Sequence, residues 1–135
     1  MTDRVLVVDD DPFMCEAVNV ILSQAGYDVS VANCGADAIE MIRAAMPSVI
    51  LLDIRMPGIS GLQTLAKLRQ LGVSTPILMM TADNSPATLQ EVMFLGGSGY
   101  VLKPFEADEI VERVGLAIAE AAAPKLPRRS LRNHY

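Results

Sequence analysis

Five short apolar runs recur along the chain at roughly regular spacing, and most are rich in Val, Ile and Leu. They are Val5–Val8, Val29–Ala32, Val49–Leu52, Ile77–Met80 and Tyr100–Leu102. Continuous apolar runs, rather than alternating ones, are typical of strands that are buried on both faces of a parallel sheet. The pattern therefore predicts five such strands.

The segments between these runs carry apolar residues at helical spacing. In the first segment, positions i, i+3, i+4, i+7 and i+8 are occupied by Met14, Ala17, Val18, Ile21 and Leu22. Asp11 and Pro12 precede them and form a favourable N-cap and first-turn pair. Similar patterns follow the other four runs, so five strand–helix units alternate. This alternation predicts an α/β protein with a doubly wound parallel sheet and helices on both faces.

Length and composition fit one domain with a mainly aliphatic core. The chain has 135 residues, of which 51% are hydrophobic and only 4% aromatic. No apolar run approaches the ~20 residues of a membrane span, and the N-terminus lacks the apolar stretch of a signal peptide, so we expect a cytoplasmic protein. Cys15 and Cys34 lack metal-site spacing, and we expect both to be reduced and mostly buried.

Charge is distributed unevenly along the chain. Residues 1–123 hold all 16 acidic residues and 7 of the 11 basic ones, so this part carries −9 although the whole chain carries −5. Such an acidic body is a poor binder of nucleic acid, so we expect no direct nucleic-acid binding by it. Residues 124–135 are basic and contain proline, which predicts a solvated tail or the start of an interdomain linker.

Polar side chains gather at the carboxyl ends of the predicted strands, the edge where sheets of this type bind ligands. Asp9 and Asp10 follow the first strand, Asp53 the third, Thr81 the fourth and Lys103 the fifth. Clustered carboxylates at a half-buried edge need a cation, and all-oxygen ligands favour Mg²⁺. A carboxylate beside such a cation can act as a nucleophile toward phosphorus. Any one of these residues alone would be read as a cap, a turn residue or a surface lysine.

Four motifs occur in order at these strand ends: "VVDD", "LLDIRMPG", "MMTAD" and "GYVLKPF". With them the chain resembles the receiver domain of bacterial response regulators, the phosphoacceptor part of two-component signalling. The similarity covers roughly residues 3–121. The resemblance implies a flavodoxin-like (βα)₅ fold with strand order 2-1-3-4-5, and we assign residues 1–123 to the receiver domain.

The resemblance also implies roles for the acidic residues. Asp53 would be the phosphorylated residue. Asp53 and Asp10 would bind Mg²⁺ directly. Asp9 would act through water and outer contacts, and Arg55 would offer its backbone carbonyl; Mn²⁺ could substitute for Mg²⁺. The Lys103–Pro104 peptide is expected to be cis, as in the family.

The remaining implied roles concern the switch. Thr81 would bind the phosphoryl group and Lys103 would pair with it. Movement of Thr81 would let Tyr100 turn inward and reshape the face formed by the fourth helix, fifth strand and fifth helix. Candidate partner contacts on that face are Met93, Phe94 and Phe105.

The implied partners are a histidine kinase or histidine phosphotransfer protein, and an output domain or effector. A phosphorylation-dependent homodimer is a further option, and no membrane partner is expected. The domain would not be an enzyme beyond promoting its own phosphorylation and dephosphorylation. Arg55 and Asp83 would tune the lifetime of the phosphoryl group, and their opposite charges could pair across the mouth of the site and hinder water.

Other readings stay open at this point. Asp9 and Asp11 form a D-x-D that also suits an aspartate-nucleophile phosphohydrolase, although the chain lacks room for the cap of such enzymes. A flavin-binding domain of the same fold would need a phosphate loop where this chain has carboxylates, which repel phosphate. The protein could also be the N-terminal part of a longer regulator, a stand-alone receiver, or a receiver that acts only by protein contact.

Overall fold

The computed structural model describes residues 2–123, so the basic segment 124–135 lies outside the described residues. Strands and helices alternate as predicted. The strands are β1 (Arg4–Val8), β2 (Asp28–Ala32), β3 (Val49–Asp53), β4 (Ile77–Thr81) and β5 (Gly99–Leu102). The helices are α1 (Pro12–Gln24), α2 (Gly35–Ala44), α3 (Gly61–Gln70), α4 (Pro86–Phe94) and α5 (Ala107–Ala122).

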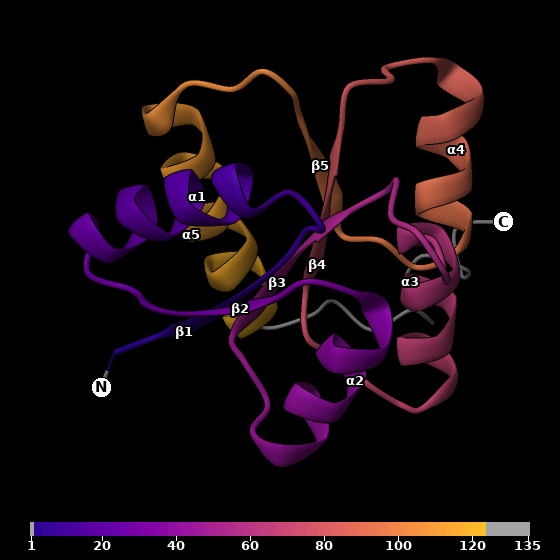
Figure 1. The fold of residues 1–135 in the computed structure, drawn as a ribbon, viewed down its shortest axis with the longest axis horizontal. Coiled ribbons are helices and arrows are strands. Elements are labelled where there is room, and N and C mark those ends of the chain that lie inside the picture. Colours follow the sequence, from indigo (N-terminus) through magenta and orange to yellow (C-terminus); the bar gives the residue numbers. More distant parts are fainter. Residues whose placement is uncertain (1, 124–135) are drawn as a thin grey trace, which may run out of the picture.

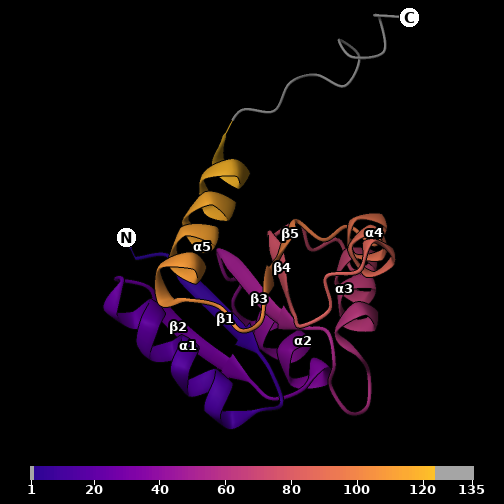
Figure 2. The same ribbon diagram turned by 90° about the horizontal axis from the view of Figure 1, so that it is seen from above.

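The five strands form one parallel sheet in the order β2-β1-β3-β4-β5. Figure 1 shows α1 and α5 on one face of this sheet and α2, α3 and α4 on the other. The view from above in Figure 2 separates the same two helical layers. The predicted flavodoxin-like fold and strand order are therefore confirmed. None of the helices within residues 2–123 is long and apolar enough to cross a membrane.

Alternate residues of the central strands supply two separate cores. In β1, Val5 and Val7 pack into the core under α1 and α5, whereas Leu6 and Val8 pack into the core under α2, α3 and α4. The strands β3 and β4 are divided in the same way, which explains their uninterrupted apolar sequences. The expectation that every strand is buried on both faces is wrong for β2. Its Asp28 and Ser30 are exposed, because this strand lies at the edge of the sheet.

Polar caps fix where the helices begin at the carboxyl edge. Asp11 caps α1 by accepting the backbone N–H of Phe13 at 3.0 Å, as predicted. Ser60 and Gln63 form a reciprocal capping box at the start of α3. Each such cap contributes about 1 kcal/mol to helix stability. These caps hold the helix starts that surround the candidate site.

Candidate functional site

Three carboxylates meet at the carboxyl ends of the adjacent strands β1 and β3. One oxygen from each of Asp9, Asp10 and Asp53 lies within 4.8 Å of the other two. Asp9 is 1% exposed and Asp53 is 7% exposed, whereas Asp10 is open to solvent. A set of hard oxygen donors with one open side fits a divalent cation such as Mg²⁺ that keeps several of its waters.

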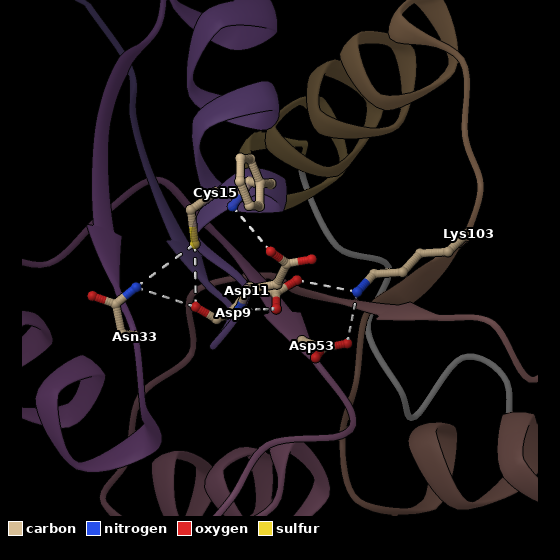
Figure 3. A network of polar contacts seen from close by, with 7 residues as sticks. Asp9, Asp11, Cys15, Asn33, Asp53 and Lys103 are labelled. Atoms are coloured by element: carbon tan, nitrogen blue, oxygen red, sulfur yellow. Dashed lines mark hydrogen bonds and ion pairs between the residues drawn. The ribbon is translucent and has the colours of Figure 1, made fainter.

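Lys103, directly after β5, places its ammonium group between two of these carboxylates. Its Nζ atom lies 3.1 Å from Oδ2 of Asp9 and 3.0 Å from Oδ1 of Asp53 (Figure 3). Burial favours a lower pKa for Lys103, but hydrogen bonds and charge from Asp53 and Asp9 outweigh burial and raise it. Burial raises the pKa of Asp53; the hydrogen bond from Lys103 opposes this rise and the charge of Asp9 adds to it. The cluster is thus incompletely neutralised and attracts additional positive charge.

The three consecutive aspartates that follow β1 differ in their hydrogen bonds and ion pairs. Asp9 is held from several sides: its backbone N–H donates to the carbonyl of Ala32 at 3.1 Å, its Oδ1 accepts the N–H of Asp11 at 3.0 Å, and its Oδ2 faces Lys103. Asp11 turns away and caps α1. Asp10 makes no side-chain hydrogen bond or ion pair with residues 2–123 in the structure, so its carboxylate is free to bind a cation.

A cavity of about 290 Å³ opens beside Asp53, which is ample for a phosphoryl group. It is lined by Asp53, Ile54, Arg55, Thr81, Ala82, Asp83 and Lys103. The structure therefore brings the predicted residues together around one opening. They are the phosphoacceptor Asp53, the phosphoryl-binding Thr81 and Lys103, and Arg55 and Asp83, which were predicted to tune phosphoryl lifetime.

The hydroxyl of Thr81 is buried and engaged by the loop that follows β4. It accepts the N–H of Asp83 at 2.9 Å and donates to the carbonyl of the same residue at 3.2 Å. The Asp83 carboxylate accepts the N–H of Ser85 and the hydroxyl of Thr88, each at 2.8 Å. These hydrogen bonds, the backbone one from Ser85 foremost, lower the pKa of Asp83. A short series of hydrogen bonds through Asp83 thus joins Thr81 to the first turn of α4.

The ion pair predicted between Arg55 and Asp83 is not formed in this structure. Arg55 is exposed, and its charge is only a minor cause of the lowered pKa of Asp83. The physical reason is local: the Asp83 carboxylate is already satisfied by Ser85 and Thr88 and is directed toward α4. A role for either residue in phosphoryl lifetime therefore stays a prediction.

The face formed by α4, β5 and α5, which was predicted to contact partners, exposes only some of its predicted apolar side chains. Met93 is 61% and Phe94 is 88% exposed at the end of α4, but Phe105 packs against the core under α1 and α5. Tyr100 is half-buried against the opposite core, with the Arg113 guanidinium carbon 5.9 Å from its ring centroid. The Lys103–Pro104 peptide is cis, as expected.

Two side chains that contact the site were missed from the sequence. Cys15 was interpreted only as a small core residue, and Asn33 was not singled out. Both donate to the backbone carbonyl of Asp9. Burial, and then the charge of Asp9, raise the pKa of the Cys15 thiol, which keeps it protonated as a donor. The only sequence signal was the place of Cys15 in the first helical turn after the acidic run.

Comparison with known proteins decides the family. A family model described as the response regulator receiver domain matches residues 5–115. The chain belongs to this family. It is a receiver domain of the kind found in two-component response regulators.

Individual relatives agree with this assignment. The chain is 37% identical over 119 residues to the transcriptional regulatory protein DltR of Streptococcus agalactiae, a match that covers 88% of the chain and 53% of that relative. The receiver therefore spans about half the length of the curated relatives it matches. Among solved structures, the chemotaxis protein CheY4 of Vibrio cholerae is 31% identical with a TM-score of 0.84, covering 87% of this chain and 99% of that one.

Proposed function

We propose that this receiver is a phosphorylation-dependent switch that accepts a phosphoryl group on Asp53 from a partner histidine kinase or histidine phosphotransfer protein. The observation that carries the proposal is the position of Lys103, which joins buried Asp9 to Asp53 while Asp10 stays open beside them. Two of the three carboxylates are thereby held in place, and the third is left for a cation. A surface cluster of acids without function would not need a half-buried ammonium group at its centre.

The residues divide the chemistry between them. Asp10, Asp53 and the backbone carbonyl of Arg55 would hold Mg²⁺, or Mn²⁺ in its place, and Asp9 would act from outside this set. The cation supplies neutralisation of charge on the transferring oxygens. An Asp53 oxygen attacks phosphorus, so that a P–O bond forms as the P–N bond to the partner's histidine breaks. The Lys103 ammonium, already 3.0 Å from Asp53, would then pair with a phosphoryl oxygen.

The switch would begin with the Thr81 hydroxyl. To donate to a phosphoryl oxygen, the hydroxyl must give up the hydrogen bond that it donates to the Asp83 carbonyl. This loosens the link through Asp83 to Thr88 in α4. Tyr100 would turn inward as Thr81 moves, and the α4-β5-α5 face would change shape. Exposed Met93 and Phe94 lie on that face, which supports it as the contact surface for an output domain or effector.

The length of the relatives supports a larger protein around this domain. The chain spans about half of DltR, which is named a transcriptional regulatory protein. This supports the proposal that the receiver is one part of a longer regulator. The placement of the receiver at residues 1–123, at the N-terminal end, with residues 124–135 as the start of a linker, stays a prediction from the sequence. The alternative is a stand-alone receiver acting by contact, which the near-complete coverage of CheY4 favours. Phosphorylation-dependent homodimerisation would use the same α4-β5-α5 face.

Intact-mass measurement tests the proposal. Incubated with acetyl phosphate and Mg²⁺, the protein is expected to gain one phosphoryl group, and Asp53→Asn or an EDTA control is expected to gain none. Absence of labelling in folded protein that also fails to bind Mg²⁺ would contradict the proposal and leave the contact-only receiver. Continued consumption of acetyl phosphate without added mass would favour the phosphohydrolase, although Asp11 of its D-x-D is occupied as the cap of α1, or a very short-lived phosphoaspartate.

A second prediction concerns phosphoryl lifetime. Arg55 and Asp83 line the cavity beside Asp53, and we expect attacking water to reach Asp53 through this opening. We expect Arg55→Ala and Asp83→Ala each to shorten the lifetime of labelled protein several-fold, because they widen this opening. Decay is measured by mass spectrometry after removal of the phosphodonor. Asp83→Asn is the matched control, since it removes the charge but keeps hydrogen-bonding atoms for Ser85 and Thr88. Unchanged lifetimes in both alanine variants would contradict this prediction.

A further inference from the structure

The peptide group between Asp9 and Asp10 is held by two side chains that lie outside the acidic cluster. The Cys15 thiol, in the first turn of α1, donates to the Asp9 carbonyl oxygen at 3.2 Å. The Asn33 amide nitrogen, in the loop after β2, approaches the same oxygen at 3.4 Å and the Cys15 sulfur at 4.0 Å. Figure 3 shows both side chains converging on this carbonyl, on the side of Asp9 away from Lys103.

The Asp10 side chain has no contact of its own within the described residues that would fix its direction. Its carboxylate is one of the three that lie within 4.8 Å of one another, yet its side chain is exposed and has no hydrogen bond or ion pair with residues 2–123. Since a peptide unit is planar, fixing the Asp9 carbonyl also fixes the direction in which the chain enters Asp10. A thiol is a weak donor, but Cys15 is only 4% exposed, and shielding from water strengthens its bond.

We propose that Cys15 and Asn33 are positioning residues that orient the Asp9–Asp10 peptide so that the Asp10 carboxylate faces Asp53 across the divalent-cation site. This inference rests on the proposed Mg²⁺-dependent function. Neither side chain touches the cation; each acts through the backbone of Asp9. Outer partners of metal ligands typically change metal affinity by about 10–100-fold, and the two donors share that effect here.

The test is titration calorimetry with Mg²⁺, and separately Mn²⁺, on the full chain without phosphodonor. We expect Cys15→Ala and Asn33→Ala each to weaken cation binding several-fold, and the double variant about tenfold. Cys15→Ser keeps a donor and is expected to restore most of the affinity. Cys34→Ala is the matched control, because Cys34 caps α2 and does not touch Asp9.

Stability measured by urea unfolding in EDTA separates positioning from loss of fold. Asn33 is exposed, so Asn33→Ala is expected to keep wild-type stability even where Cys15→Ala does not. Wild-type affinity in the double variant would overturn the inference and leave the proposed function intact. Equal weakening in Cys34→Ala, or no recovery in Cys15→Ser, would also overturn it. A wild-type chain that binds neither cation would overturn both the inference and the proposed function.

Discussion

Replacing Gly61 with alanine is expected to destabilise the protein by more than about 3 kcal/mol. A Cβ atom at Gly61 would overlap the backbone carbonyl oxygen of Asp53 and lie 2.7 Å from Cα of Ile54. Both neighbours are backbone atoms, so neither can rotate away. The first turn of α3 can approach β3 this closely only without a side chain, and the Gly61 N–H uses the approach to donate to the Ile54 carbonyl at 2.8 Å.

Urea unfolding of Gly61→Ala beside Gly115→Ala gives a matched comparison. At Gly115, inside α5, the nearest atom to an added Cβ is the Tyr27 hydroxyl oxygen at 3.7 Å, which is ordinary contact. Alanine there is expected to stabilise the protein by about 0.5–1 kcal/mol through higher helix propensity. Opposite signs for the two variants support the steric explanation. A Gly61→Ala protein within about 1 kcal/mol of wild type would contradict it.

The Gly61 contact also links the fold to the site. Relief of the overlap requires α3 to move away from the strand end that carries Asp53. We therefore expect folded Gly61→Ala protein to bind Mg²⁺ more weakly and to label more slowly with acetyl phosphate, whereas Gly115→Ala behaves as wild type.

Much of the site could be predicted from the alternation of strands and helices. Once five strand–helix units are recognised, the residues after each strand must share one edge of a parallel sheet, and Asp9, Asp53, Thr81 and Lys103 occupy those positions. The edge strand β2 shows the limit of the same pattern, because whether a strand is central or peripheral depends on the order of strands in space. Its alternating "DVSVA" carries that information only when the order is known.

Contacts that depend on side-chain direction could not be predicted. The Arg55–Asp83 pair was a reasonable expectation from charge, but hydrogen bonds from Ser85 and from Thr88 in α4 decide where Asp83 points. To predict that Cys15 and Asn33 both contact the Asp9 carbonyl, one would need to know the rotation of α1 about its axis and the path of the loop after β2. Neither is encoded in the periodicity of apolar residues.

Removing the ammonium group at the centre of the site is expected to have the second large effect. Without divalent cation near pH 7.5, Lys103→Met is expected to lower the free energy of unfolding by about 2 kcal/mol, because two buried carboxylates lose their shared partner. The loss is smaller than for a fully buried pair because the Lys103 side chain is 20% exposed.

The sign of the pH dependence follows from the two pKa shifts. The raised pKa of Lys103 contributes stability that is complete below its unfolded value and is lost as pH rises through the folded value. The raised pKa of Asp53 acts as a penalty, absent at acid pH and growing as pH rises from about 4 through the folded pKa. Lys103→Met removes the hydrogen bond that restrains the Asp53 shift. The stability gap between wild type and variant is therefore expected to widen from about pH 4.5 to pH 7.5.

A second substitution distinguishes lost charge balance from lost packing. In the Lys103→Met background, Asp53→Asn removes one of the two opposed carboxylates and is expected to recover a large part of the stability, whereas lost packing would not be recovered.

Mg²⁺ is expected to bind Lys103→Met more tightly than wild type, because a competing positive charge beside Asp53 is gone. The same variant is expected to lose the response to phosphorylation, since no ammonium group remains to pair with the phosphoryl oxygen. Weaker Mg²⁺ binding in Lys103→Met would show instead that the lysine serves chiefly to hold Asp9 and Asp53 in position.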